Sequence, residues 1–212
     1  QVNELYLLSH EDLILRAKSA RLWVDVSPKA IQTCVEALDL IENQSEKALL
    51  TRFLFNYFSV VWDTPDAPEK NDPEFASRAA SIFRVMANIP PANLVHRKRA
   101  IQAAFESQNY PVVFEQCDQA RDEFGAAALD DGIWTLWGQS VVSLEKGNWT
   151  AYAQRQFSGI PPETHWARLI EVMDKSSDLL PADLDVQSGR VWTYVGAKIP
   201  VKRAQIVYES AL

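Results

Sequence analysis

The chain has 212 residues, of which 47% are hydrophobic and 23% are charged, as is ordinary for a soluble globular protein with a buried core. Its net charge of −7 and its pI near 5.0 disfavour binding to nucleic acid or to an anionic membrane through a broad basic face. No apolar run reaches the length of about 18 residues that a membrane span needs, so the sequence predicts no span.

Three helices are predicted in the first 62 residues, each from a capping signal followed by an apolar stripe. Residues 9–12 read as a capping box, and residues 27–28 place a proline at the first position of the second helix. Ser45 is the expected N-cap of the third helix, residues 46–62. This third helix is apolar over more than half its circumference, so we expect it to be the most buried element of this half.

The stretch 63–73 contains three prolines and four acidic residues, a composition that cannot continue a helix. It predicts either a surface loop or a boundary between two sub-bundles, residues 1–62 and 74–212. We favour a loop within a single all-α domain of residues 1–212, followed by a helix over residues 74–88.

The centre of the chain predicts two consecutive helical hairpins. The first begins with Pro91 in the first turn of a helix, and Pro111 opens its second helix, which Gly125 closes as a C-terminal cap. The second hairpin has its turn at residues 147–148 and continues to about residue 157. Their apolar residues recur at helical spacing, which indicates packing of one face.

The phrase Trp134-x-x-Trp137-Gly138 resembles the opening of a tetratricopeptide repeat unit. The two hairpin turns lie about 40 residues apart, close to the periods of tetratricopeptide, HEAT and armadillo repeats. The helix after Trp134 is longer than in the standard tetratricopeptide unit, and the closing proline is missing. The sequence therefore predicts antiparallel helical hairpins, roughly nine to eleven helices in all, as a short degenerate tetratricopeptide-like or other α-helical repeat array, and assigns no family.

The last part of the chain gives weaker signals. Residues 161–162 restart a helix, and Pro200 opens a final one. Between them, the stretch 179–199 is rich in β-branched and aromatic residues, and a short strand and an irregular helix are equally compatible with it.

Motifs for metals, phosphates and nucleophilic catalysis are absent from the sequence. Cys34 and Cys117 are predicted to be buried free thiols, with a single disulfide as the alternative. The histidines, His10, His96 and His165, do not have the spacing of a helical zinc pair. The sequence therefore predicts no cofactor, no metal site and, on balance, no enzyme.

The leading functional hypothesis is an interaction or scaffold domain that binds a protein or peptide partner through the central hairpins. Tryptophan and arginine are enriched in protein interfaces, although the same tryptophan spacing is also typical of core packing. The predicted groove is lined by Trp134, Trp137 and Trp149, with Arg97, Lys98 and Arg99 as its rim.

Two alternatives belong to other functional classes. The first is a self-assembling nucleocapsid-like or coat-like protein that binds RNA through Arg97, Lys98, Arg99, Lys202 and Arg203, which the net charge disfavours. The second is a helical enzyme with an acidic pocket formed by Glu163, His165 and Glu171.

The cellular compartment is indicated only indirectly. The absence of a signal-peptide pattern and the presence of two cysteines favour an intracellular location. Because the chain begins with Gln1 rather than Met, we expect a processed product or an excised segment. The identity of the partner and the oligomeric state do not follow from the sequence.

Overall fold

The computed structural model describes residues 31, 34–36, 38–144 and 162–197, and every regular element within these ranges is a helix. The predicted all-α class is therefore confirmed. The α-helices are α4 (Gln44–Asp63), α5 (Phe75–Ala87), α6 (Leu94–Glu106), α7 (Tyr110–Phe124), α8 (Asp131–Leu144), α10 (Pro162–Leu179) and α11 (Leu184–Gly196). The short 3-10 segments are η2 (Leu38–Leu40), η3 (Pro68–Asn71) and η4 (Ala126–Ala128).

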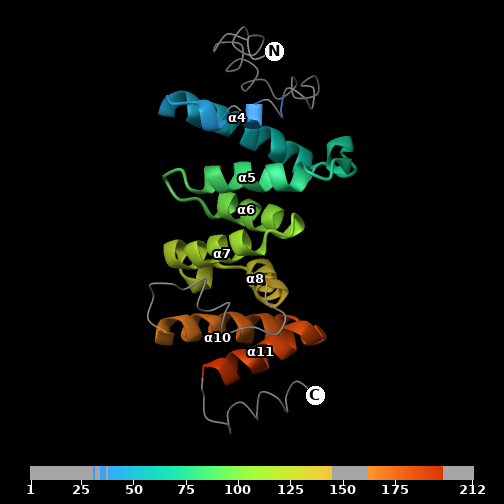
Figure 1. The fold of residues 1–212 in the computed structure, drawn as a ribbon, viewed down its shortest axis with the longest axis vertical. Helices are drawn as coiled ribbons and strands as arrows, with labels where there is room; N and C mark the ends of the chain where they lie inside the picture. The colour runs from blue at the N-terminus through green and yellow to red at the C-terminus, as the bar shows by residue number, and fades with distance from the viewer. Residues whose placement is uncertain (1–30, 32–33, 37, 145–161, 198–212) are drawn as a thin grey trace.

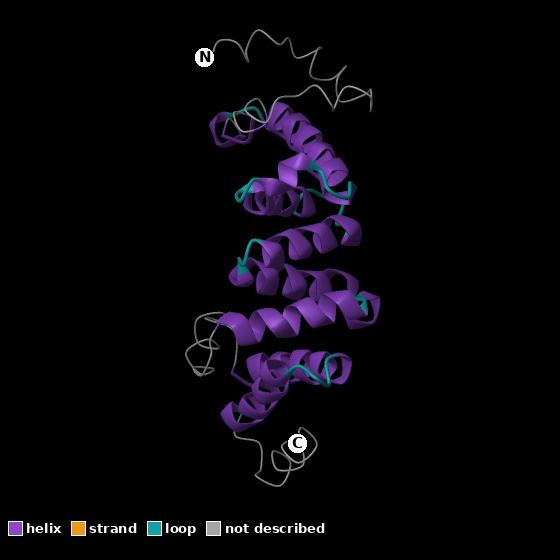
Figure 2. Cartoon of the chain, turned by 90° about the vertical axis from the view of Figure 1, so that its right-hand side faces the viewer, coloured by secondary structure: helices purple, strands orange, loops and turns teal. Residues whose placement is uncertain are grey.

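The helices are stacked in chain order along the long axis of the molecule, with α4 near one end and α11 near the other (Figure 1). Each α-helix packs against the next described helix along the chain, and α8 also packs against α6 and α11. The view from the side shows the same order of layers (Figure 2). The fold is thus built mainly from contacts between neighbours in the sequence.

Side-chain caps explain where α4 and α6 begin. In both helices the first residues differ from those that the sequence predicted. The Oδ1 atom of Asn43, and not Ser45, caps α4 by accepting hydrogen bonds from the backbone of Ser45 at 2.9 Å and Glu46 at 3.4 Å. Pro91 does not lie in the first turn of α6, because Asn93 forms the equivalent cap and the helix begins at Leu94.

Both predicted ends of α7 are confirmed by local geometry. Pro111 lies in the first turn of α7, and Gly125 ends that helix with φ +82°, a value that glycine adopts easily. Asp130 and Asp183 accept hydrogen bonds from the first turns of α8 and α11, at 3.0 and 3.1 Å. Of the two alternatives for residues 179–199, the helix is correct for Leu184–Gly196.

The hydrophobic core is a single cluster of contacting side chains that extends from Ile31 to Val186. The stretch 63–73 is mostly exposed and contains η3, but Ala67 is buried within this cluster. The single-domain organisation, with or without sub-bundles, stays a prediction that cooperative unfolding can test.

Two glycines allow close approach of helices in the second half of the stack. A Cβ atom added to Gly138 of α8 would lie 2.3 Å from the Cβ of Ser176 on α10. A Cβ atom added to Gly196 of α11 would lie 2.4 Å from the ring of Trp166 on α10. The Ser176 hydroxyl donates to the backbone carbonyl of Trp134 at 2.7 Å, which joins α10 to α8.

The predicted number of helices and the tetratricopeptide-like repeat are not confirmed. The helices expected at residues 9–24, at 149–157 and after Pro200 lie outside the described residues. The helical hairpins that the structure does describe agree with the coarser prediction of an all-helical chain.

Candidate functional site

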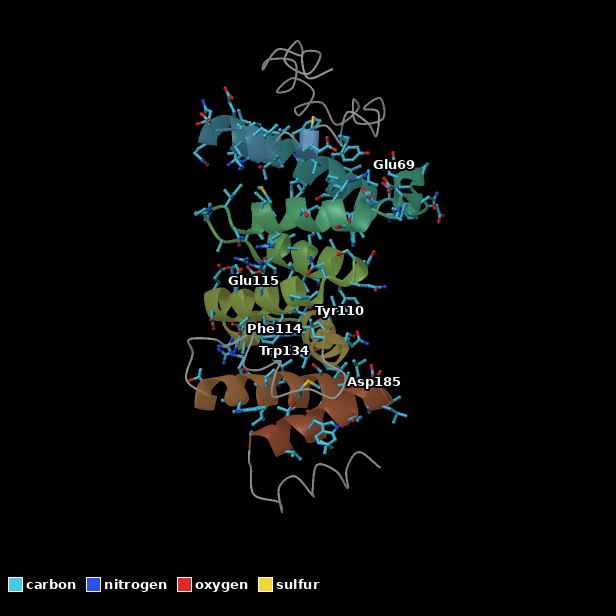
Figure 3. The ribbon with its side chains drawn as sticks, in the orientation of Figure 1. Glu69, Tyr110, Phe114, Glu115, Trp134 and Asp185 are labelled. Atoms are coloured by element: carbon cyan, nitrogen blue, oxygen red, sulfur yellow. The ribbon has the colours of Figure 1, made fainter. Side chains whose placement is uncertain are left out.

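The aromatic residues of the predicted groove belong to the core. Trp134 is 4% exposed and Trp137 is fully buried, and their rings stack at 5.5 Å with an interplanar angle of 15°. Phe114 of α7 meets Trp137 edge-on at 5.6 Å, and Figure 3 shows Phe114 and Trp134 where α7 faces α8. The groove hypothesis is corrected for these two residues, because their surfaces are used in packing, and Trp149 lies outside the described residues.

Arg97 points into the protein, where only 2% of it is exposed, and is not part of a solvated rim. The side-chain oxygens of Asn88, Gln116 and Gln119 lie 2.7–2.8 Å from its Nη1 and share the two N–H donors of that nitrogen. Its Nη2 donates to both carboxylate oxygens of Glu123 at 2.7 and 2.8 Å. The network therefore joins the α5–α6 connection to α7 through an ion pair between the buried Arg97 and the exposed Glu123.

The two neighbouring cations are also paired within the chain. Lys98 donates to the carboxylate of Asp130, and Arg99 binds both oxygens of Asp63, at 2.6 and 3.1 Å. The hydrogen bond from Arg99 lowers the pKa of Asp63, so this carboxylate stays charged beside the guanidinium at neutral pH. All three residues of the predicted basic cluster thus have carboxylate partners.

The acidic pocket of the enzyme hypothesis is represented in the described residues by Glu171. Its carboxylate accepts a hydrogen bond from Nε of Arg121 on α7 at 2.9 Å. Nearby, Arg168 binds Asp118 and Asp122 of α7, and burial raises the pKa of Asp118. Glu171 therefore belongs to a set of ion pairs between α7 and α10. The side chains of Glu163 and His165, and also residues Lys202 and Arg203, lie outside the described part of the chain.

A first hollow opens beside Arg97, with a volume of about 220 Å³. One wall is formed by Ala87 at the end of α5 and by residues 88–90 and Ala92 of the α5–α6 connection. The other wall is formed by Gln119 and Glu123 of α7, with Arg97 between the two walls. We call it the Arg97 hollow. Pro90 and Ala92 are exposed at its edge, and Val95, at the start of α6, is 63% exposed.

A second hollow, of about 230 Å³, lies where α4, η3 and α5 meet. Its aromatic lining is Tyr57, Phe58 and Phe75, and its charged lining is Glu69, Asp72 and Arg78. We call it the Glu69 hollow, and Figure 3 labels Glu69 at this end of the molecule. Sequence reasoning treated residues 63–73 only as a connection; the signal that it missed was an acidic loop beside a helix rich in aromatic residues.

Within the described ranges, neither the two cysteines nor any cluster of ligand-type side chains forms a metal or redox site. Cys34 and Cys117 are buried free thiols, as predicted, and burial raises the pKa of both. Among the described residues, no group of three or more His, Cys, Asp and Glu side chains is arranged to hold a metal ion. None of the described helices has the length and apolar character that a bilayer span requires.

The fold and its hollows define an all-α protein built as an ordered stack of helices. No protein-family model matches the chain, and comparisons with curated proteins and with solved structures find no match. Function must therefore be argued from the site alone.

Proposed function

We propose that this protein is a non-enzymatic helical scaffold that binds a protein partner through the central hairpins, at the Arg97 hollow. The observation that supports this proposal is the way the walls of the hollow are held. Arg97 bonds to Asn88 on one wall and to Gln119 and Glu123 on the other, so a single buried side chain fixes their separation. A cavity whose walls are already ordered loses little entropy when a partner binds.

The size and lining of the Arg97 hollow favour one uncharged side chain of a partner. Its volume of about 220 Å³ is below the roughly 300–1,000 Å³ of sites for drug-sized molecules. Ile89 and Pro90 supply apolar surface, and the amides of Asn88 and Gln119 supply polar groups. Because the charge of Arg97 is offset by the bidentate contact with Glu123, the hollow gives little attraction to an anion.

The two alternative functions receive no support from the described residues. Binding of RNA phosphates by Arg97, Lys98 or Arg99 would require each cation to give up its carboxylate partner. Catalysis by Glu171 would likewise require release from Arg121. The scaffold proposal needs no rearrangement of these ion pairs.

The test uses a photo-reactive side chain in place of Ala92, which is exposed at the edge of the hollow, in the full chain, added to an extract of the source cells. We expect one protein to be cross-linked, and we expect Ile89→Glu, which places a charge on the wall of the hollow, to abolish that product. Ser188→Glu, at an exposed position of α11, is the matched control and should leave it unchanged. Equal cross-linking in the Ile89→Glu variant, or a nucleic-acid product in its place, would refute the proposal.

A further inference from the structure

The acidic loop 63–73 folds back over an aromatic surface. Tyr57 and Phe58 come from α4, and Phe75 from the start of α5, and each is less than 9% exposed. Their rings form a connected set, because the ring centroid of Phe58 lies 5.4 Å from that of Tyr57 and 5.5 Å from that of Phe75. The loop places Glu69 and Asp72 at the edge of this surface, in the Glu69 hollow.

Among the described residues, the lining of the Glu69 hollow has more carboxylates than cations. Arg78 is the one cation among the lining residues that the structure describes, and it is bound by Asp72 at 2.8 Å and by Glu74. Asp72 is further occupied by the backbone N–H of Glu74, at 2.9 Å. The half-buried carboxylate of Glu69 forms no ion pair within the described ranges. Carboxylates thus outnumber cations here, and Glu69 is the one placed to receive a ligand.

Tyr57 strengthens this argument from charge. Burial and the nearby charge of Glu69 raise the pKa of Tyr57 to about 12. The carboxylate of Glu69 is therefore near enough to Tyr57 for its charge to act on the phenol, which places a negative charge beside the aromatic lining. Aromatic rings next to a carboxylate are the usual environment for an organic cation in proteins.

We propose that the Glu69 hollow binds an alkylammonium group, such as a lysine side chain or a small free amine. The alkyl part would contact Phe58 and Phe75, and the ammonium group would pair with Glu69 near Tyr57. The volume of about 230 Å³ suits a single such group better than a drug-sized ligand. The inference concerns a different surface from the Arg97 hollow and does not rest on the proposed scaffold function.

The experiment is an NMR titration of the full chain, following backbone amides from Glu69 to Phe75. The probes are n-butylammonium, choline, the methylamide of Nα-acetyl-lysine, and 1-butanol as the neutral isostere. We expect saturable shifts with at least one cation, in the millimolar range, and no comparable shifts with 1-butanol. Tighter binding of the lysine derivative would identify a protein side chain as the source, and tighter binding of a free amine would identify a small molecule.

Two variants make the assignment specific. Glu69→Gln should weaken binding about tenfold or more, because it removes the charge-assisted contact. Asp66→Asn removes one charge from the same loop, outside the lining of the hollow, at a positive φ of 56° that asparagine tolerates. It should leave binding within about twofold, as expected for a screened surface charge. Equal weakening by both variants, equal binding of 1-butanol, or no shifts with any cation would overturn the inference. None of these results would affect the cross-linking test of the Arg97 hollow.

Discussion

Gly138→Ala tests the contact between α8 and α10, where a glycine lets the two helices approach closely. In most helix interiors this change stabilises a protein, because glycine costs about 0.5–1 kcal/mol relative to alanine. Here the added Cβ would lie 2.2 Å from Oγ and 2.3 Å from Cβ of Ser176. The hydroxyl could rotate away, but the Cβ is fixed by the α10 backbone, so the two helices must separate.

The magnitude follows from the size of that separation. Moving the two Cβ atoms from 2.3 Å to the roughly 3.5 Å of a good carbon–carbon contact requires a displacement of about 1.2 Å. It would also weaken the hydrogen bond of 2.7 Å from Ser176 to the carbonyl of Trp134. Overpacking of this kind costs about 1–3 kcal/mol and exceeds the gain in helix propensity. We expect a net loss of about 1–2 kcal/mol in the free energy of unfolding, or about 2–8 °C in Tm.

The assay is urea unfolding followed by circular dichroism, with Gly132→Ala of the same helix as the control. At Gly132 the nearest atom to an added Cβ is the exposed carboxylate of Asp130, at 3.2 Å, so the change should stay within about 0.5 kcal/mol of the wild type. Adding Ser176→Gly to Gly138→Ala should recover about 1 kcal/mol relative to the sum of the single changes. If Gly138→Ala is as stable as the wild type or more stable, the close approach of α8 and α10 is refuted.

Two further predictions concern ion pairs and pH. Glu123→Gln should lower the free energy of unfolding by about 1–3 kcal/mol, because it leaves the buried Arg97 charge without its carboxylate. The control is Glu115→Gln, whose ion pair with Arg84 is exposed and 3.8 Å long, and it should cost less than about 0.5 kcal/mol in the same urea assay. Equal losses in the two variants would contradict the argument. Burial lowers the pKa of His96, which packs edge-on against Phe55 at 4.6 Å. The unfolded chain therefore binds more protons than the folded chain between the lowered pKa and about 6.5, and stability should fall as the pH falls through this window. Unfolding of His96→Gln should show a weaker loss over that range; an unchanged pH dependence would show that His96 is not its source.

The candidate sites show which conclusions need contacts between distant residues. The spacing of Trp134 and Trp137 indicated one apolar helix face, but the same spacing is compatible with a groove and with a core. Periodicity defines which residues share a face, whereas the element that covers the face is set by packing, here by α7 and α10. For this reason Trp134 and Trp137 pack in the core and do not line a groove.

Arg97 illustrates the same limit for a charged residue. Helical spacing placed Arg97 on the polar face of its helix. A charged side chain is buried only where partners offset the cost of its desolvation, and spacing within one helix does not reveal such partners. Those partners, Asn88, Gln116 and Glu123, come from other segments, up to 26 residues away. The Glu69 hollow likewise depends on the folding of loop 63–73 over α4 and α5.

The sequence alone determined the all-α class and several helix ends, because capping residues and apolar stripes act over one or two turns. Pro111 and Gly125, at the two ends of α7, are placed by such local rules. Residues 184–196 were compatible with strand or helix until packing was known; the Asp183 cap and the bonds from Arg190 and Tyr194 to Asp174 of α10 hold the helix. The burial of polar groups and the positions of the hollows follow from tertiary packing, because these features depend on side chains far apart in the chain.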